Sequence, residues 1–206
     1  FFKIFSLMDI KTPENKFQDV SYGEELFTEL LDHLVTDVEK DRHHLSLFLG
    51  LYTPNKQKAL QKLEQKLNRK THVVNTSDLS SRIESESFEK LDDFFDNMDQ
   101  SDDILYFKNG EKLCGVYTSY SHSQTKYATP QERYFLEKVK AFNGLVIVDI
   151  EEFSDADKTL RRAAHSVVSF TLPDSKFKRA WWHIKNYSAH GCELKTTRPE
   201  AYGETG

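Results

Sequence analysis

The sequence predicts a doubly wound α/β fold, in which a five-stranded parallel sheet is covered by helices on both faces. Two observations carry this prediction. Amphipathic helical patterns alternate with short apolar runs from residue 23 to residue 187, and the apolar runs are uninterrupted rather than alternating apolar with polar residues. Continuous apolar strands are typical of parallel sheets, because both faces of such sheets are buried.

The bulk composition fits one large domain, or one with a small appendage. The chain has 206 residues, of which 38% are hydrophobic and 13% aromatic, enough for a substantial core. The net charge of −5 argues against a general nucleic-acid surface. Cys114 and Cys192 are too few for a disulfide framework, which favours a reducing, cytoplasmic compartment.

The two ends of the chain give little sign of a membrane or export signal. No apolar run approaches the roughly 20 residues that span a bilayer, so no membrane partner is expected. The apolar N-terminus lacks a basic region and a cleavage site. The sequence does not begin with Met, and we expect a fragment whose neighbouring domains are missing.

The first third of the chain supplies two strands and two helices. Residues 1–16 have no clean period and predict an extended leading segment. Apolar residues at helical spacing predict an amphipathic helix over residues 26–38. The apolar run 45–49 predicts a strand, the helix after it reaches Leu67, and residues 72–75 predict another buried strand.

The middle of the chain repeats this alternation. Residues 88–98 predict a helix with one acidic face, and residues 104–107 predict the third strand. Residues 115–129 are rich in Ser, Thr and Tyr and predict the longest loop. Pro130 marks the start of a helix, and the Asn-Gly pair at residues 143–144 ends it.

The last third completes the sheet. Residues 145–150 and 166–170 predict the fourth and fifth strands, separated by a short helix over residues 155–164. A final helix runs to residue 187, and the polar, aperiodic residues 188–206 predict a flexible tail.

Residues 47–67 have the layout of strand, sharp loop and helix in which nucleotide-binding P-loops occur. On the Walker A pattern G-x-x-x-x-G-K-[ST], Gly50 and Lys56 match the first glycine and the lysine. Asn55 replaces the second glycine, and Gln57 replaces the hydroxyl that binds magnesium. A strand ending in glycine before a lysine-rich helix also arises by chance, which is the alternative interpretation.

The order of these elements resembles the large subdomain of the AAA+ ATPase family, a P-loop NTPase-like domain, over residues 17–187. The segment KYATPQERYFLEKVKAFNGLVIV is similar to the family's stretch between its Walker B and sensor strands. FQDVSYGEELFTELLDHL resembles the family's lead-in strand and first helix, and TLPDSKFKRAWWHI resembles the turn and helix that close the subdomain. For an intact member, the resemblance implies ATP, magnesium and protein remodelling.

The positions that the resemblance assigns to catalysis carry unsuitable residues. Lys108 stands where the family has its magnesium-binding Asp, Asn109 where it has its water-activating Glu, and Glu151 where it has its sensor Asn. An ammonium group at a metal site repels the ion by roughly 4 kcal/mol at 4 Å and intermediate dielectric. We therefore expect neither magnesium nor ATP hydrolysis.

Two further expectations concern the former P-loop. The Thr53-Pro54 pair predicts a helix that begins about two residues early, with the Thr53 hydroxyl capping the donors that a phosphate would use. Lys56 is expected to be a solvated helix lysine, although contact with a phosphate is the alternative. Lys108 and Glu151 either form an ion pair that fills the vacated site or point independently into solvent.

Arginines near residue 162 indicate a possible subunit interface. Arg162 fits one position of the family's arginine-finger pair, Ala163 occupies the other, and Arg161 lies one residue away. The partners that this implies are AAA+-like subunits or missing domains of the same protein.

Other polar groups have structural interpretations. No metal is expected, because the histidines lack a ligand spacing and are interpreted as surface or core residues. The acidic run after residue 92 is interpreted as a solvated helix face, and the tryptophan pair at residues 181–182 as core and rim. The histidines considered are His33, His43, His44 and His72.

The sequence thus predicts a catalytically inactive AAA+-like module that serves as an assembly, scaffold or protein-interaction domain, with no cofactor required. The alternative is a sensor that binds ATP or ADP without magnesium or hydrolysis. An active ATPase that remodels proteins is the third and least favoured interpretation.

Overall fold

The chain folds into two compact units, residues 1–171 and residues 172–206. The elements below belong to the first unit. A computed structural model describes residues 20–23, 25–40, 42–98, 103–113, 116–117, 126–152, 155–170, 175–177, 180–181 and 184.

Several predictions from the sequence lie outside the described residues. They concern the leading segment 1–16, both cysteines, Trp182 and the tail 188–206. In the second unit, the described Trp181 is exposed, so this member of the tryptophan pair is not a core residue.

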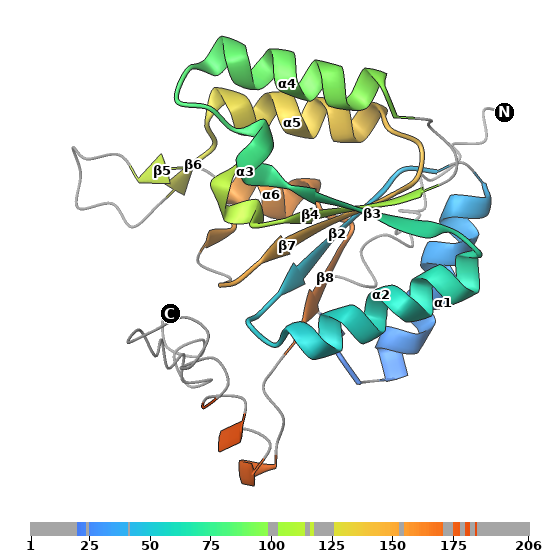
Figure 1. Ribbon diagram of the computed structural model, residues 1–206. Helices are drawn as coiled ribbons and strands as arrows, with labels where there is room; N and C mark the ends of the chain where they lie inside the picture. The colour runs from blue at the N-terminus through green and yellow to red at the C-terminus, as the bar shows by residue number, and fades with distance from the viewer. Residues whose placement is uncertain are drawn as a thin grey trace, which may run out of the picture. The chain divides into compact units, whose positions relative to one another are not determined.

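Six parallel strands form the main sheet, in the order β1-β8-β2-β7-β4-β3 (Figure 1). The doubly wound parallel fold is confirmed, with one strand more than predicted because Val20 and Ser21 pair with β8. The strands are β1 (Val20–Ser21), β2 (His44–Leu49), β3 (Lys70–Asn75), β4 (Asp103–Lys108), β7 (Leu145–Ile150) and β8 (Ser166–Ser169).

A second, two-stranded antiparallel sheet lies in the predicted long loop. It consists of β5 (Val116–Tyr117) and β6 (Lys126–Tyr127).

Helices cover both faces of the main sheet (Figure 1). Helices α1 (Glu25–Glu39) and α2 (Thr53–Leu67) lie on one face. The other face carries α3 (Thr76–Leu79), α4 (Glu84–Asp96), α5 (Pro130–Ala141) and α6 (Lys158–Ala163), and a 3-10 turn, η2 (Gly110–Lys112), follows β4. Over the described residues, no helix is long and apolar enough to cross a membrane.

The alternation of side chains along the central strand β2 divides the core in two. Leu45, Leu47 and Leu49 belong to the cluster beneath α4 and α5, whereas Phe48 belongs to the cluster beneath α1 and α2. Every residue of β2 is buried, as a strand covered on both faces requires.

Strand β3 differs from its prediction. It forms an edge of the sheet, and only Val74 is buried, whereas Val73 is 51% exposed. The adjacent valines at residues 73 and 74 indicated a strand buried on both faces. At the edge of the sheet, however, only one face of the strand is buried.

Candidate functional site

The loop between β2 and α2 is the segment where the sequence indicated a P-loop. Gly50 has φ +112°, and a Cβ atom there would lie 2.4 Å from the carbonyl oxygen of Phe170. The Gly50 N–H donates to the carbonyl of Ile150 at 3.1 Å, and the Phe170 N–H donates to that of Leu49 at 2.8 Å. The close approach of the chain after β8 therefore requires glycine here, whether or not a phosphate binds.

Helix α2 begins at Thr53, early as predicted, and Pro54 lies in its first turn. The predicted cap by Thr53 is wrong, because Thr53 is itself helical and its hydroxyl donates to the Leu51 carbonyl at 3.4 Å. The residue before the helix is Tyr52, whose side chain makes no capping hydrogen bond. The N-terminus of α2 thus has no side-chain cap.

On the other face, α4 also lacks a side-chain cap, whereas α5 and α6 each have one. At α5, the Thr129 hydroxyl accepts from the Glu132 N–H at 3.2 Å. At α6, the Asp157 carboxylate accepts from the N–H groups of Thr159 and Leu160 at 2.7 and 2.8 Å. Both are ordinary side-chain caps, so the missing cap distinguishes α2 from these two helices.

The Lys56 side chain lies between α2 and the sheet rather than in solvent, so the prediction of a solvated lysine is wrong. Its residue is 3% exposed, and its Nζ pairs with Oδ1 of Asp149 on β7. The Tyr106 hydroxyl, from β4, donates to Oδ2 of the same carboxylate at 2.5 Å. Burial, and then the Asp149 charge, raises the pKa of Tyr106 far above its ordinary value, so its hydroxyl keeps its proton.

The position of Lys56 follows from where α2 begins. Because the helix starts at Thr53, Lys56 comes one turn into it and shares the buried stripe of Ala59 and Leu63, three and seven residues further on. Its methylene stem packs with these residues and its ammonium group reaches the sheet. We refer to Lys56, Tyr106 and Asp149 as the carboxyl-end cluster, because it lies where β2 ends.

The residues at the Walker B position take part in hydrogen bonds between neighbouring strand ends. Lys108 and Asn109 are exposed at the end of β4. Asn109 is left-handed, with φ 57°, and its Nδ2 donates to Oδ1 of Asn75 at 2.9 Å. The Thr76 hydroxyl donates to the Lys108 carbonyl at 2.9 Å and contacts that of Asn109. These bonds connect the ends of β3 and β4.

The predicted pair of Lys108 with Glu151 is not among the ion pairs of the described residues, whereas Lys56 with Asp149 is. Glu151 instead lies near Glu111. The pKa of Glu111 is raised, first by burial and then by the negative charges of Glu151 and Asp155. The space beyond β4 and β7 is therefore acidic, which is unfavourable for a phosphate.

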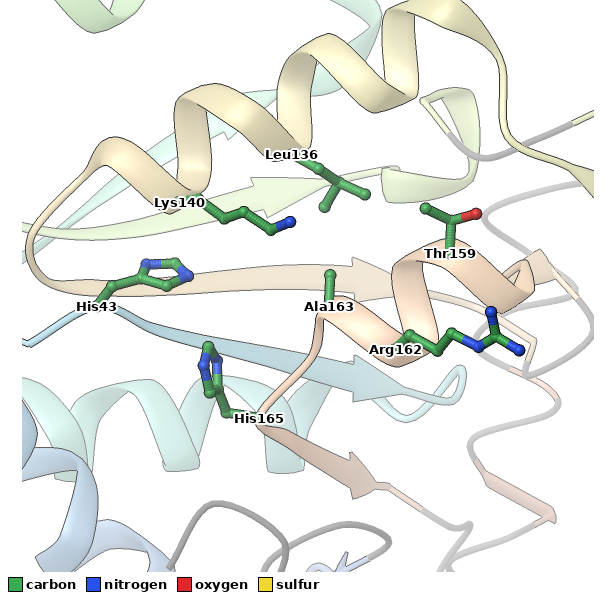
Figure 2. Close-up of a pocket in the computed structure, with 7 residues that line it drawn as sticks. All are labelled: His43, Leu136, Lys140, Thr159, Arg162, Ala163 and His165. Atoms are coloured by element: carbon green, nitrogen blue, oxygen red, sulfur yellow. The ribbon is translucent and has the colours of Figure 1, made fainter. Parts of the chain in front are cut away.

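A hollow of about 400 Å³ lies between α5, α6 and the residues that precede β2 and β8 (Figure 2). Its lining includes the cationic side chains of Lys140 and Arg162 and two histidines, and no carboxylate. Burial, and then the neighbouring His165, lowers the pKa of His43 to about 4, so this imidazole is neutral at pH 7. In Figure 2, His43 and Lys140 extend into this space, and Arg162 extends away from the histidines. The lining residues are His43, Leu136, Lys140, Thr159, Arg162, Ala163 and His165.

The two arginines singled out in the sequence have different surroundings. Arg161 Nε donates to the Ala156 carbonyl at 3.1 Å, which holds its side chain against the protein. Arg162 is exposed on the wall of the hollow. Of the two, only Arg162 therefore presents its side chain to a partner.

At the amino end of β2, a carboxylate lies between two histidines. Oδ2 of Asp37 is 3.0 Å from Nδ1 of His33, one turn earlier on α1, and 3.0 Å from Nδ1 of His44. Nε2 of His44 is 3.1 Å from the Ser166 hydroxyl, which is 2.9 Å from that of Ser46. We refer to His33, Asp37 and His44 as the amino-end cluster.

The sequence indicated only part of these clusters. The spacing of His33 and Asp37, four residues apart in a helix, was visible, but His44 joins them through the fold. Asp149 was visible as a charge inside an apolar strand, a pattern that calls for a buried partner. His72 belongs to neither cluster; its ring packs near Phe94, at 6.1 Å between centroids.

Comparison with known proteins identifies the fold. No protein-family model matches the chain, and no curated protein sequence matches it. A chain of the E. coli MS115-1 HORMA:CdnC:Trip13 complex is similar over 83% of this chain and 69% of its own length, with TM-score 0.56 and 11% identity.

Two structures of the FIGL-1 AAA domain are similar as well. The domain in complex with ADP matches with TM-score 0.54 and 12% identity over 84% of this chain. The other matches with TM-score 0.55 and 14% identity over 81%. The chain spans 62% and 58% of these two structures, less than two thirds. The protein therefore has an AAA+ ATPase-like fold, as its sequence predicted.

Proposed function

We propose that this domain is a catalytically inactive AAA+-like module that acts through protein contacts, as an assembly or scaffold domain. The observation that carries the proposal is the buried ion pair of Lys56 with Asp149. In a working P-loop, the lysine reaches the β- and γ-phosphates of the nucleotide. Here its charge is neutralised inside the core.

The magnesium nucleotide that the fold implies does not fit the residues present. Pro54 has no N–H for a phosphate, and Gln57 and Lys108 cannot supply a hydroxyl and a carboxylate to magnesium. The pKa of Glu111 is raised first by its burial and then by the negative charges of Glu151 and Asp155, against the opposing charge of Lys112, and a phosphate near these carboxylates would be repelled by them. Each feature opposes binding of a phosphate or its metal, so no hydrolytic step is assigned.

The surface around Arg162 is the favoured contact. It presents an exposed guanidinium beside a hollow that is also lined by Lys140 and by no carboxylate, and an acidic side chain of a partner protein is complementary to these two cations. A similar fold occurs in the HORMA:CdnC:Trip13 complex, where it is assembled with other proteins. AAA+-like subunits, or other domains of the same protein, are the partners proposed.

The test of lost activity combines melting and turnover. We expect no shift in Tm with ATP or ADP, with or without magnesium, and no phosphate release above a protein-free control. The Lys56→Met variant serves as a control, since a preparation whose phosphate release persists in this variant contains a contaminating ATPase. Turnover that needs Lys56 would overturn the proposal.

The missing cap of α2 favours the alternative, a sensor that binds ATP or ADP without hydrolysis. Because no side chain caps this helix, N–H groups of its first turn are available to an anion. The sensor predicts a rise in Tm with ADP that persists in EDTA, without phosphate release. The scaffold predicts no rise.

The contact surface is tested by site-specific photo-cross-linking. A photoreactive residue at position 162 is compared with one at position 58, an exposed lysine on α2. We expect cross-linking to one defined protein from position 162 and none from position 58. Equal or absent products at both positions would exclude this surface as the interface.

A further inference from the structure

We propose that His33, Asp37 and His44 bind a divalent transition-metal ion, and that zinc is the ion whose chemistry they fit. The inference is independent of the proposed function, because the cluster lies at the amino end of β2, away from the former P-loop. It also revises the expectation that the histidines of this chain are ordinary surface or core residues.

The geometry is that of three ligands converging on one point. Each residue offers one ligand atom, and the three atoms lie within 4.8 Å of one another. Both imidazole Nδ1 atoms are 3.0 Å from Oδ2 of Asp37. Tetrahedral zinc with bonds of about 2.0–2.1 Å holds its ligand atoms about 3.3 Å apart. The two distances to Asp37 therefore need to change by a few tenths of an ångström, whereas the two imidazole nitrogens, which lie within 4.8 Å of each other, need to approach by at most about 1.5 Å.

The ligand types select the class of metal. Two imidazoles and one carboxylate suit zinc and neighbouring transition metals, whereas calcium and magnesium prefer oxygen ligands throughout. Three protein ligands leave a fourth tetrahedral position for water or another group. A closed structural site would use four protein ligands, so this site resembles an open one.

The surrounding residues hold two of the ligands in place. Nε2 of His44 faces the Ser166 hydroxyl, which is bonded in turn to Ser46, and such outer contacts orient metal-binding imidazoles. His44 is 1% and Asp37 6% exposed.

His33 is the most exposed of the three ligands. Its side chain is 21% exposed, although its Nδ1 atom is itself buried, and it lies one helical turn from Asp37. Access of an ion to the three ligand atoms therefore requires a movement of the His33 side chain rather than unfolding of α1. The bound ion would then join α1 to the start of β2.

A cluster that only forms hydrogen bonds is the competing explanation. In that case, Asp37 accepts from both imidazole N–H groups, and Nε2 of His44 forms a hydrogen bond with the Ser166 hydroxyl. The two arrangements differ in a measurable way, because a metal displaces protons from both Nδ1 atoms.

The experiment uses untagged protein treated with EDTA and titrated with Co²⁺, then with Zn²⁺ in competition. We expect one Co²⁺ per chain with the visible absorption of tetrahedral cobalt, displaced by one Zn²⁺. His33→Gln should weaken binding at least about tenfold. His72→Gln, which changes a histidine of β3 outside the cluster, should leave binding unchanged.

Imidazole ¹⁵N chemical shifts of the unmodified protein provide a second measurement that needs no variant. Zinc should move the Nδ1 resonances of His33 and His44 to metal-bound values and leave His72 unchanged. The proposal is overturned by the absence of saturable Co²⁺ binding, by full binding in His33→Gln, or by Nδ1 atoms that stay protonated in zinc.

Discussion

The carboxyl-end and amino-end clusters lie on the same face of the sheet, beneath α1 and α2, and differ in how their charges are satisfied. In the carboxyl-end cluster, the carboxylate of Asp149 has an ammonium partner and a hydroxyl partner. In the amino-end cluster, the carboxylate of Asp37 lies between two imidazoles. The cation of the first cluster is the buried Lys56, whereas among the described residues Asp37 has only the largely exposed guanidinium of Arg42, at 3.9 Å from its Oδ1, and its Oδ2 faces the two imidazoles.

This difference supports the proposal that the lysine at the P-loop position of this ATPase-like fold no longer binds a phosphate. A buried carboxylate and lysine that pair with each other have no charge left for an external ligand. The Asp37 carboxylate faces two imidazole nitrogens, and its one cationic neighbour among the ion pairs of the described residues, Arg42, is largely exposed, so lone pairs of its Oδ2 remain for an ion. Similar burial therefore leads to opposite expectations for ligand binding at the two ends of β2.

The largest loss of stability is expected when Lys56 loses its partner Asp149. Asp149→Leu leaves Lys56 buried and unpaired, and removing one partner of a buried pair costs about 3–5 kcal/mol. The double variant Lys56→Met/Asp149→Leu should recover part of this loss, since an apolar pair of similar volume is tolerated, although the Tyr106 hydroxyl still lacks its acceptor. Urea unfolding of the three proteins measures both changes. A loss below about 1 kcal/mol in Asp149→Leu would show that Lys56 escapes to solvent.

Zinc provides the next largest effect and tests whether the two clusters are independent. At a free concentration one hundred times its Kd, zinc should raise the free energy of unfolding by about 2.7 kcal/mol. The increase should be the same in Lys56→Met/Asp149→Leu and absent in His33→Gln. Thermal or urea unfolding in zinc and in EDTA measures it. A zinc effect that disappears in the double variant would place the metal at the wrong end of β2.

The order of the strands and helices was predictable because apolar periodicity is local. The starts of α2 and α5 were predictable for the same reason, since Pro54 and Pro130 favour the first turn of a helix. Strands β1, β5 and β6 have two residues each, too few to show a period. The edge position of β3 depends on the whole sheet and was not visible in its own residues.

The candidate sites were harder to predict, because their partners are distant in sequence. Lys56 and Asp149 are separated by 93 residues, and His44 and Ser166 by 122. The assignment of Lys56 to solvent overlooked its place in the stripe of Ala59 and Leu63. A lysine on an apolar stripe and an aspartate within an apolar strand are each unusual, and considering them together would have suggested the pair.

A smaller effect is expected from the hydroxyl of the carboxyl-end cluster. Tyr106→Phe keeps the ring, which packs near Phe48 at 6.4 Å between centroids, but removes the hydrogen bond to Asp149. A bond to a charged group contributes about 1.5–3 kcal/mol, and the remaining pair with Lys56 places this loss at about 1.5 kcal/mol. Urea unfolding measures the change.

Tyr134→Phe is the matched control for Tyr106→Phe. Its hydroxyl also donates to an aspartate, Asp92, at 2.7 Å, but this pair lies at the surface, where water replaces the lost bond. We expect a smaller loss than in Tyr106→Phe. Equal losses would mean that burial does not strengthen the carboxyl-end cluster.

The smallest effect is a pH dependence beyond the ends of β4 and β7. The pKa of Glu111 is raised by burial and by Glu151 and Asp155, so the folded protein holds a proton that the unfolded chain releases earlier. The stability from this proton is complete below the ordinary pKa of glutamate and is lost as pH rises through the folded pKa. The Glu111→Gln variant has no such titration, so its free energy of unfolding relative to that of the wild type should increase from pH 4 to pH 7.

The control is Glu89→Gln, at an exposed position of α4, which should show no such trend. A parallel pH profile for wild type and Glu111→Gln would mean that the acidic groups do not repel one another, which would remove one argument against a phosphate site there.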